Sequence, residues 1–212
     1  MKTTDKKTAI LDTALRLFVE QGFHTSSTAQ IAKQAGVATG TLFHHFPTKE
    51  ALMKQLFLNV KQEFADAIRS NIHSNADGQS QHNIEPGDEL KTTARNLWFA
   101  ALEWAANHPL KQQFFQLYSL SPIITTELRD QAMNTTLGFI AELIKQGQTL
   151  GVIQDYPLKL MQDNCHGQFL AAISYFSDNP EYWQLPAHKE ASFMLFWNAI
   201  AKPQTENQEI HS

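Results

Sequence analysis

The chain has 212 residues, of which 42% are hydrophobic and 18% are charged, enough for one substantial domain or two small ones with a buried core. Its formal net charge is −4, and a single cysteine, Cys165, excludes an internal disulfide and favours the reducing cytoplasm. No apolar run approaches the roughly 20 residues that cross a bilayer. Asp12 and Arg16 interrupt the apolar stretch near the amino terminus, which argues against a signal peptide.

The charge is unevenly distributed along the chain. Residues 1–54 carry seven basic and four acidic side chains, a net charge of +3, whereas the remainder carries ten basic and 17 acidic side chains, a net charge of −7. A mildly basic small domain on an acidic body is compatible with a DNA-binding protein whose larger part has another task.

The first predicted element is a helix over residues 4–21, ended by Gly22. Its apolar residues recur at helical spacing and are Ile10, Leu11, Ala14, Leu17 and Phe18. Lys2, Lys6 and Lys7 precede this stripe. They could reach DNA phosphates or form an ordinary solvated helix end.

Residues 26–49 predict two short helices joined by a glycine turn, the geometry that lays a second helix in the major groove of DNA. Ser27 can cap the first helix, and Gln30 completes a capping-box pattern. Gly36 supplies the left-handed residue that ends it. The second helix spans residues 39–45. Its inward residues are expected to be Leu42 and Phe46, and its outer face Thr39, Gly40, Thr41, His44 and His45.

The rest of the chain predicts further helices and no strand, because no segment alternates with a period of two. Thr48 caps a long helix over residues 49–70, and the polar residues 71–88 predict a loop. His73 and His82 in this loop have no carboxylate or cysteine at ligand spacing, so we expect no metal site. The remaining helices are expected at residues 88–107, 109–118, 126–150, 157–177 and 187–201, with a bulky connection before the last one.

The pattern from Ile10 to Leu52 resembles the amino-terminal domain of the TetR/AcrR family of transcriptional regulators. The matching residues are GF at 22–23, SST at 26–28, IA at 31–32, AGV at 35–37, GTLF at 40–43, HHF at 44–46 and KE at 49–50. The resemblance implies an all-α fold of about nine helices. Residues 1–48 would form a three-helix helix-turn-helix domain, residues 49–203 a helical ligand-binding and dimerisation domain, and residues 204–212 a flexible tail.

The resemblance also implies which residues contact DNA. By position they are Ser27, Thr39, Gly40, Thr41, Phe43, His44, His45 and Lys49. Hydroxyls and backbone amides at helix starts bind phosphate, and short threonines can face base edges. The chain departs from the family pattern at Ala38, often serine, and at Phe43, often tyrosine, so two hydroxyls are missing.

The helix over residues 187–201 is apolar nearly all round and must be buried by something. In the family, the last two helices, here the eighth and ninth, usually meet their twofold mates in a four-helix bundle. A homodimer also suits a palindromic operator, because paired reading heads then contact symmetric half-sites. The alternative is that this helix packs only within its own subunit.

An effector would bind in the helical body, where aromatic side chains and a few polar groups suit a moderately apolar ligand. The candidate residues are Trp98, Phe99, Trp104, Phe115, Tyr118, Phe139, His166, Phe169 and Tyr175. Ordinary core packing is the alternative for each of them. Cys165 beside His166 is not a catalytic pair, because adjacent helix positions point about 100° apart.

No phosphate loop, GxSxG, HExxH or CxxC motif is present, so neither an enzyme nor a cofactor is expected. We therefore expect a repressor released from its operator by a small molecule. The ligand would tilt the helix over residues 49–70 and change the spacing of the two recognition helices from the roughly 34–36 Å that matches successive grooves. A helix-turn-helix architectural or partner-binding protein without an inducer is the alternative.

Overall fold

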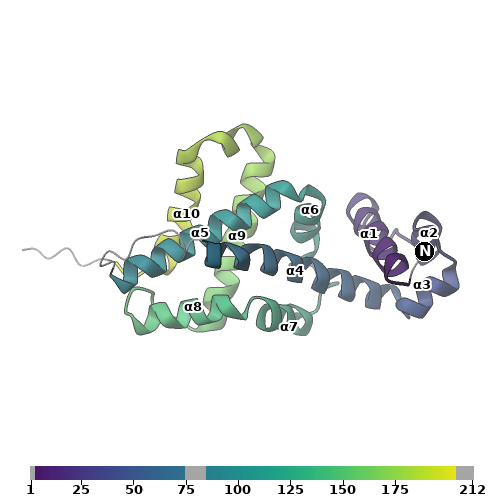
Figure 1. Cartoon of the computed structure of the whole chain (residues 1–212), viewed down its shortest axis with the longest axis horizontal. Coiled ribbons are helices and arrows are strands. Elements are labelled where there is room, and N and C mark those ends of the chain that lie inside the picture. Colours follow the sequence, from purple (N-terminus) through teal and green to yellow (C-terminus); the bar gives the residue numbers. More distant parts are fainter. Residues whose placement is uncertain (1–2, 75–84, 204–212) are drawn as a thin grey trace, which may run out of the picture. The chain divides into compact units, whose positions relative to one another are not determined.

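A computed structural model describes residues 3–74 and 85–203, and this part of the chain is almost entirely helical (Figure 1). Its extended backbone pairs only in an isolated antiparallel bridge between Ile153 and Ala201, which confirms the all-α class. The helices are α1 (Thr3–Gln21), α2 (Thr28–Gln34), α3 (Thr39–His45), α4 (Lys49–Ser74), α5 (Pro86–Asn107), α6 (Pro109–Tyr118), α7 (Thr126–Thr136), α8 (Gly138–Thr149), α9 (Leu158–Asp178), the 3₁₀ helix η1 (Pro180–Gln184) and α10 (Pro186–Ile200).

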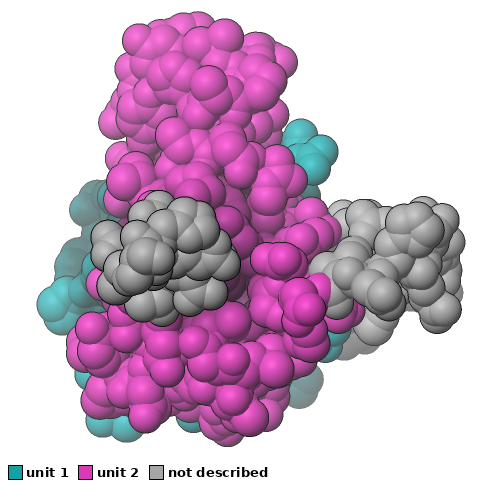
Figure 2. Space-filling model, turned by 90° about the vertical axis from the view of Figure 1, so that its left-hand side faces the viewer, with its two compact units in different colours: residues 1–70, 103–137 teal, residues 71–102, 138–212 magenta. Residues whose placement is uncertain are grey.

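The chain forms two compact units, each built from two separate segments (Figure 2). Unit 1 comprises residues 1–70 and 103–137, and unit 2 comprises residues 71–102 and 138–212. The chain therefore passes from one unit to the other within α4, within α5 and after α7. The functional boundary expected at residue 48 lies inside unit 1 and stays a prediction, and the predicted tail lies outside the described residues.

Three short-range features shape the amino-terminal end of unit 1, where α1, α2 and α3 contact one another. Gly22 ends α1 with φ 83°, and Gly36 ends α2 with φ 67°, conformations that side chains with a Cβ rarely adopt. Between them, Ser27 caps α2 by accepting a hydrogen bond from Gln30 N at 3.1 Å. The predicted end of the first helix at residue 21 and the predicted cap at Ser27 are confirmed, because each coincides with one of these local signals.

α4 begins after Thr48, whose Oγ1 accepts a hydrogen bond from Ala51 N at 3.0 Å, as expected for a cap. The helix continues to Ser74, so the predicted end at residue 70 is wrong by one turn. Residues 71–74 contain no glycine or proline, and the first glycine after them is Gly78. Most of the predicted loop, including His82, lies outside the described residues, as does the side chain of His73.

The single helix predicted over residues 126–150 is also wrong, because the structure has α7 and α8 in its place. Leu137 leaves the helical conformation with φ −112° and ψ 18°, and its side chain is buried. Just before it, Thr135 Oγ1 and Thr136 Oγ1 donate to carbonyl oxygens one turn earlier, a contact that bends helices. Gly138 follows, and glycine is a poor helix former. The break is where the chain leaves unit 1.

In unit 2, α8 packs against α9, and α9 packs against α10. A Cβ on Gly147 would clash with the side chains of Ile153 and Leu90, so only glycine allows this close approach of α8. The connection before α10 is η1, where the sequence predicted only a bulky link. α10 itself buries Trp197 on one side and leaves Leu195 74% exposed on another.

Candidate nucleic-acid interface and effector-binding region

α3 is held by a single fully buried side chain, Leu42, while most of its surface stays open. Of the residues expected to contact DNA, Thr39, Gly40, Phe43 and His44 are exposed, and Thr41 and His45 are half-buried. The structure therefore brings all six onto one short helix with an accessible face. Phe43 is 43% exposed, so part of its ring lies on the surface of α3.

Gly40 has no structural need to be glycine. A Cβ added to it would meet no atom within 4 Å, and its backbone is ordinary helix. Glycine inside a helix costs about 1 kcal/mol relative to alanine. Close approach of an external backbone would explain the residue, as the sequence suggests.

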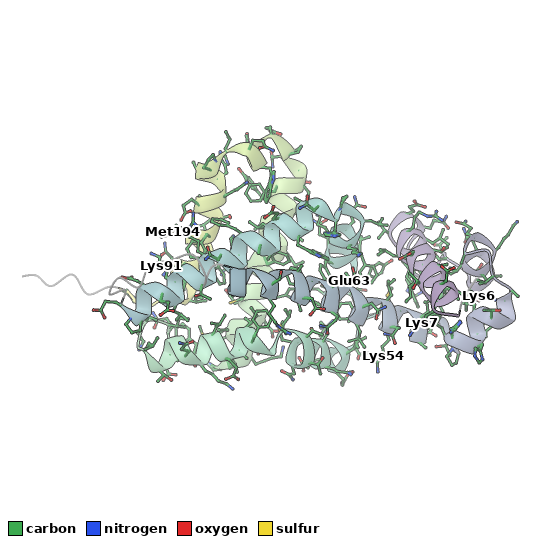
Figure 3. All side chains as sticks on the ribbon, in the orientation of Figure 1. Lys6, Lys7, Lys54, Glu63, Lys91 and Met194 are labelled. Atoms are coloured by element: carbon green, nitrogen blue, oxygen red, sulfur yellow. The ribbon has the colours of Figure 1, made fainter. Side chains whose placement is uncertain are left out.

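Polar groups flank α3 on both sides. Ser27 is exposed and uses its hydroxyl oxygen as the cap acceptor, so its proton can still be donated to a phosphate. Lys6 and Lys7 project from the start of α1, and Lys7 Nζ lies 6.0 Å from the ring centroid of Phe46, directly after α3 (Figure 3).

Lys49 has surroundings that the sequence did not indicate. Its Nζ donates hydrogen bonds to the carbonyl oxygens of Phe23 at 2.8 Å, Ser26 at 3.1 Å and His24 at 3.4 Å. The same atom lies 4.5 Å from the centroid of the Phe23 ring. All three ammonium donors are thus used to fasten the turn between α1 and α2 to the first turn of α4. A role for Lys49 at a DNA phosphate stays a prediction, and it would require at least one of these bonds to open.

Tyr118 links α6 to the DNA-binding helices. Its hydroxyl donates a hydrogen bond of 2.6 Å to the carbonyl oxygen of Phe18 in α1. The side chain is only 5% exposed, and burial raises the pKa of its phenol above the ordinary value. The sequence predicted an effector contact here, but the polar end of Tyr118 is directed at α1.

The other residues expected to contact an effector fall into separate groups. Trp104 and Phe115, both in unit 1, lie 5.6 Å apart by ring centroid, and each contacts Phe64. Tyr175 lies at the carboxyl end of α9 and is 39% exposed, and its hydroxyl bonds to His188 Nδ1 at 2.6 Å. The effector contacts expected for Trp104, Phe115 and Tyr175 stay predictions.

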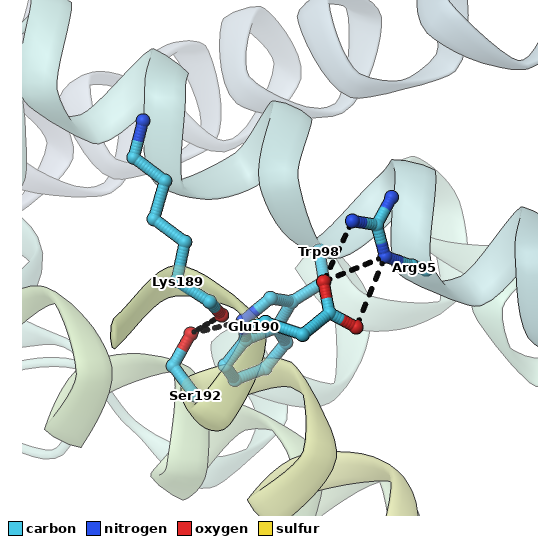
Figure 4. A network of polar contacts seen from close by, with 5 residues as sticks. All are labelled: Arg95, Trp98, Lys189, Glu190 and Ser192. Atoms are coloured by element: carbon cyan, nitrogen blue, oxygen red, sulfur yellow. Dashed lines mark hydrogen bonds and ion pairs between the residues drawn. The ribbon is translucent and has the colours of Figure 1, made fainter. Parts of the chain in front are cut away.

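Trp98 and Phe169 form a third group, in unit 2, with ring centroids 6.4 Å apart. Trp98 stacks on Phe196 of α10 at 4.6 Å, and its Nε1 donates to Ser192 Oγ at 3.0 Å (Figure 4). His166, on the same helix as Phe169, is half-buried. Trp98 therefore fastens α5 to α10, a role that aromatic spacing alone does not reveal.

An ion pair reinforces this connection between α5 and α10. Arg95 Nη2 donates to Glu190 Oε2 at 2.6 Å, and Arg95 Nε donates to the same oxygen at 2.9 Å (Figure 4). These hydrogen bonds lower the pKa of the Glu190 carboxyl. Cys165 on α9 is not a reactive thiol, because burial raises its pKa to about 11.

Two of the buried polar side chains in unit 1, Lys61 and Ser119, were not indicated by the sequence analysis. Lys61 on α4 is 5% exposed, and Ser119, directly after α6, is fully buried. A signal for Lys61 was available, because it stands four residues from each of the buried Phe57 and Ala65, on an apolar face of α4.

No three histidine, cysteine, aspartate or glutamate side chains in residues 3–74 and 85–203 come together as metal ligands. Over the same ranges, no helix is both long and apolar enough to cross a membrane.

The chain is similar to known proteins over nearly its whole length. Residues 10–56 match the family of bacterial regulatory proteins described as the tetR family. The crystal structure of a TetR-family transcription regulator from Shewanella sp. PV-4 is 60% identical in sequence. It superposes with a TM-score of 0.85 over 93% of this chain and 99% of that one.

More distant relatives agree in kind. The HTH-type transcriptional regulator BetI of Escherichia coli (strain K12) is 25% identical over 150 residues, covering 64% of this chain and 77% of BetI. The BetI of Klebsiella pneumoniae (strain 342) is 24% identical over 121 residues, so the chain spans 62% of that relative's length. The transcriptional regulator FadR of Bacillus subtilis, crystallised with stearoyl-CoA, is 19% identical with a TM-score of 0.69, which shows the fold alone. Each of these relatives bears the name of a transcription regulator.

Proposed function

The chain belongs to the TetR family of transcriptional regulators, and we propose that it is a repressor that binds a palindromic operator as a homodimer. A small molecule bound in the helical body would release it. The observation that carries this proposal is the open outer face of α3, anchored only by Leu42, with six candidate contact residues on it. Such a helix is suited to enter the major groove.

The proposed division of labour follows from chemistry. Thr39 and Thr41 carry short hydroxyls for base edges or phosphates, and Gly40 allows close approach of the DNA backbone. Ser27 and Lys7 would bind phosphate at the flanks. Lys49 would act indirectly, because its hydrogen bonds hold the turn that positions α2.

The proposed dimer interface lies on the exposed faces of α9 and α10. On α9, Gly167 and Ala171 are exposed one turn apart, and on α10 Ala187, Ala191 and Leu195 are exposed at intervals of four residues. Small side chains let two helices approach closely, and Leu195 at 74% exposure provides an apolar contact in need of cover. Pairing of these faces with those of a second copy would form the four-helix bundle.

The release step would act through α6. This helix touches α1 through the Tyr118 hydroxyl, so a ligand that moves α6 bears on the DNA-binding helices. The Bacillus subtilis regulator of this fold holds stearoyl-CoA, and from it we take only the expectation that the helical body binds a small molecule. A ligand shifts the balance between two arrangements only by its differential affinity for them, so DNA and effector should weaken each other reciprocally.

The first test is binding of the purified full-length protein to the DNA beside its own gene, at two salt concentrations, together with its mass in solution. We expect a dimer that prefers one sequence over unrelated DNA at both salt concentrations. Binding that is wholly salt-driven and unselective would contradict the repressor and favour the architectural alternative.

The dimer is tested by Leu195→Glu, which places a charge in the proposed bundle. The expected result is a monomer whose operator affinity falls on the order of 100-fold, because the two heads no longer bind together. Leu117→Glu is the matched control, since Leu117 is an exposed leucine on α6 outside the proposed interface. A Leu195→Glu protein that remains dimeric would remove α10 from the interface.

A further inference from the structure

Lys61 on α4 places an ammonium group in an apolar layer of unit 1. The side chain is 5% exposed, and its Nζ lies 4.9 Å from the ring centroid of Phe115 on α6 and 5.7 Å from that of Phe57 on α4. Burial is the only influence on its ionisation, and no oxygen atom of the described residues forms a hydrogen bond or ion pair with it. Such a charge is rare, because buried lysines are nearly always paired.

The rings do not replace a counter-ion. A cation–π contact offsets only part of the desolvation cost of a buried ion. Burial without a counter-ion lowers the pKa of the Lys61 ammonium to about 8. Lys61 still carries its charge in most molecules at neutral pH, and nothing in the described chain neutralises it.

A second polar group on the facing helix is also without a partner. Ser119 is fully buried, and its Oγ makes no hydrogen bond to any described residue. Its backbone continues the helical conformation of α6, so it lies one turn after Phe115 on the same face. Few buried polar groups in proteins are without a partner, so the Ser119 hydroxyl is free to donate a hydrogen bond to a bound group.

We propose that the effector is an organic anion whose carboxylate or phosphate group binds between α4 and α6, paired with Lys61 and hydrogen-bonded by Ser119. This inference rests on the proposed function, because it names the class of molecule that releases the repressor. The rings of Phe64, Trp104 and Phe115, which contact one another, offer an apolar wall for the rest of the molecule. A cationic ligand is excluded by repulsion from Lys61.

The location also connects the ligand to the DNA-binding helices. α6 carries Phe115, which touches Lys61, and Tyr118, whose hydroxyl binds the Phe18 carbonyl of α1. Both contacts lie within unit 1. An anion held between α4 and α6 therefore sits one turn of helix from the contact with α1.

The test is direct binding to the full-length dimer, measured by calorimetry and by tryptophan fluorescence, with Trp104 as the reporter beside Phe115. The probes are decanoate and 1-naphthoate for carboxylates and decyl phosphate for phosphates. Decanamide, 1-naphthamide and 1-decanol serve as uncharged counterparts with the same apolar bodies. We expect at least one anion to bind on the order of tenfold more tightly than its uncharged counterpart, and the preferred head group distinguishes a carboxylate from a phosphate ligand.

Three variants locate the binding. Lys61→Met should weaken the preferred anion by at least about 30-fold and leave its uncharged counterpart within about twofold, because only the charge pair is lost. Ser119→Ala should weaken the anion by about tenfold. Lys54→Met makes the same change at an exposed position of α4 and should leave both affinities unchanged. Thermal unfolding checks that each variant is folded, and Lys61→Met should melt higher than the wild type.

The proposal is overturned if no anion binds better than its uncharged counterpart, or if Lys61→Met retains the anion affinity. Ligand-free operator binding, measured on the same samples, separates this failure from failure of the repressor itself. Selective operator binding without an anion preference would keep the repressor and discard the anion site. If the ligand-free wild type does not bind its operator selectively, the proposed function itself is contradicted.

Discussion

In the first turn of α4, the Lys49 ammonium binds three backbone carbonyl oxygens and fastens the turn that precedes α2. Three turns further along the same helix, the Lys61 ammonium is buried between aromatic rings, and no described oxygen bonds to it. Lys49 stabilises the DNA-binding end of unit 1, whereas Lys61 places a buried charge in the same unit without a hydrogen-bond partner. Residue type alone therefore does not tell a structural lysine from a ligand-binding one, whereas the atoms around Nζ do.

Lys61→Met removes the buried charge that has no partner. Of the four substitutions discussed below, it has the largest expected effect on the free energy of unfolding. The folded-state pKa of Lys61 is lowered from 10.5 to about 8, so between these pH values the unfolded chain binds more protons than the folded chain. The free energy of unfolding of the wild type should therefore rise with pH across this window. At pH below 8 the buried charge costs about 3 kcal/mol, and above pH 10.5 that cost is gone.

The measurement is urea unfolding of both proteins at a series of pH values. Subtracting the variant from the wild type removes the titration of all other groups. The variant should be more stable at neutral pH, and its advantage should shrink by about 3 kcal/mol towards the alkaline end. A difference that does not change with pH would show that Lys61 is solvated or paired in solution.

Lys49→Met removes the ammonium group that donates three hydrogen bonds to backbone carbonyl oxygens. The methionine keeps the apolar stem but removes all three donors, so we expect a loss of about 2 kcal/mol in the free energy of unfolding. If Lys49 only stabilises the turn, the variant should show the same slope of the logarithm of the DNA-binding constant against the logarithm of the salt concentration. If it also contacts a phosphate, the slope should fall by about 0.9. Lys54→Met, an exposed lysine on the same helix, is the control for loss of charge.

The DNA-binding end of unit 1 could be predicted closely because its signals are local. Gly22 and Gly36 end helices by their own backbone preferences, and Ser27 and Thr48 cap helices within three residues of themselves. Each of these interactions is closed within one turn of chain. The resemblance to a known family then supplied the functional meaning of α3.

The body was predicted less well because its decisive contacts join distant segments. Residues 71–74 begin the stretch that suggested a loop but continue α4, and the break between α7 and α8 comes at Leu137, whose side chain is buried. The effector contacts expected for Trp98 and Tyr118 stay predictions, and the sequence did not indicate that their polar atoms bind Ser192 and Phe18, 94 and 100 residues away. Aromatic spacing predicts that a residue is buried and not what it touches.

Tyr118→Phe tests the hydrogen bond from the Tyr118 hydroxyl in α6 to the Phe18 carbonyl in α1. The change removes one buried donor, but Phe18 O keeps its hydrogen bond from Gly22 N at 3.1 Å. We therefore expect a loss of only about 1 kcal/mol in the free energy of unfolding. Operator affinity without effector should change little, whereas the release of DNA by an effector should be weakened. Full release by the variant would show that the signal does not pass through this bond.

Gly40→Ala should have the smallest effect on stability and a clear one on DNA binding. The added Cβ meets no atom within 4 Å, and alanine favours helix, so the free energy of unfolding should rise by up to about 1 kcal/mol. If a DNA backbone lies against α3, the same methyl group should weaken operator binding by about tenfold. Gly138→Ala is the control for DNA binding, since it also adds a Cβ in open space but lies on α8. A Gly40→Ala protein that gains stability and binds its operator as tightly as the wild type would place the DNA backbone away from this face of α3.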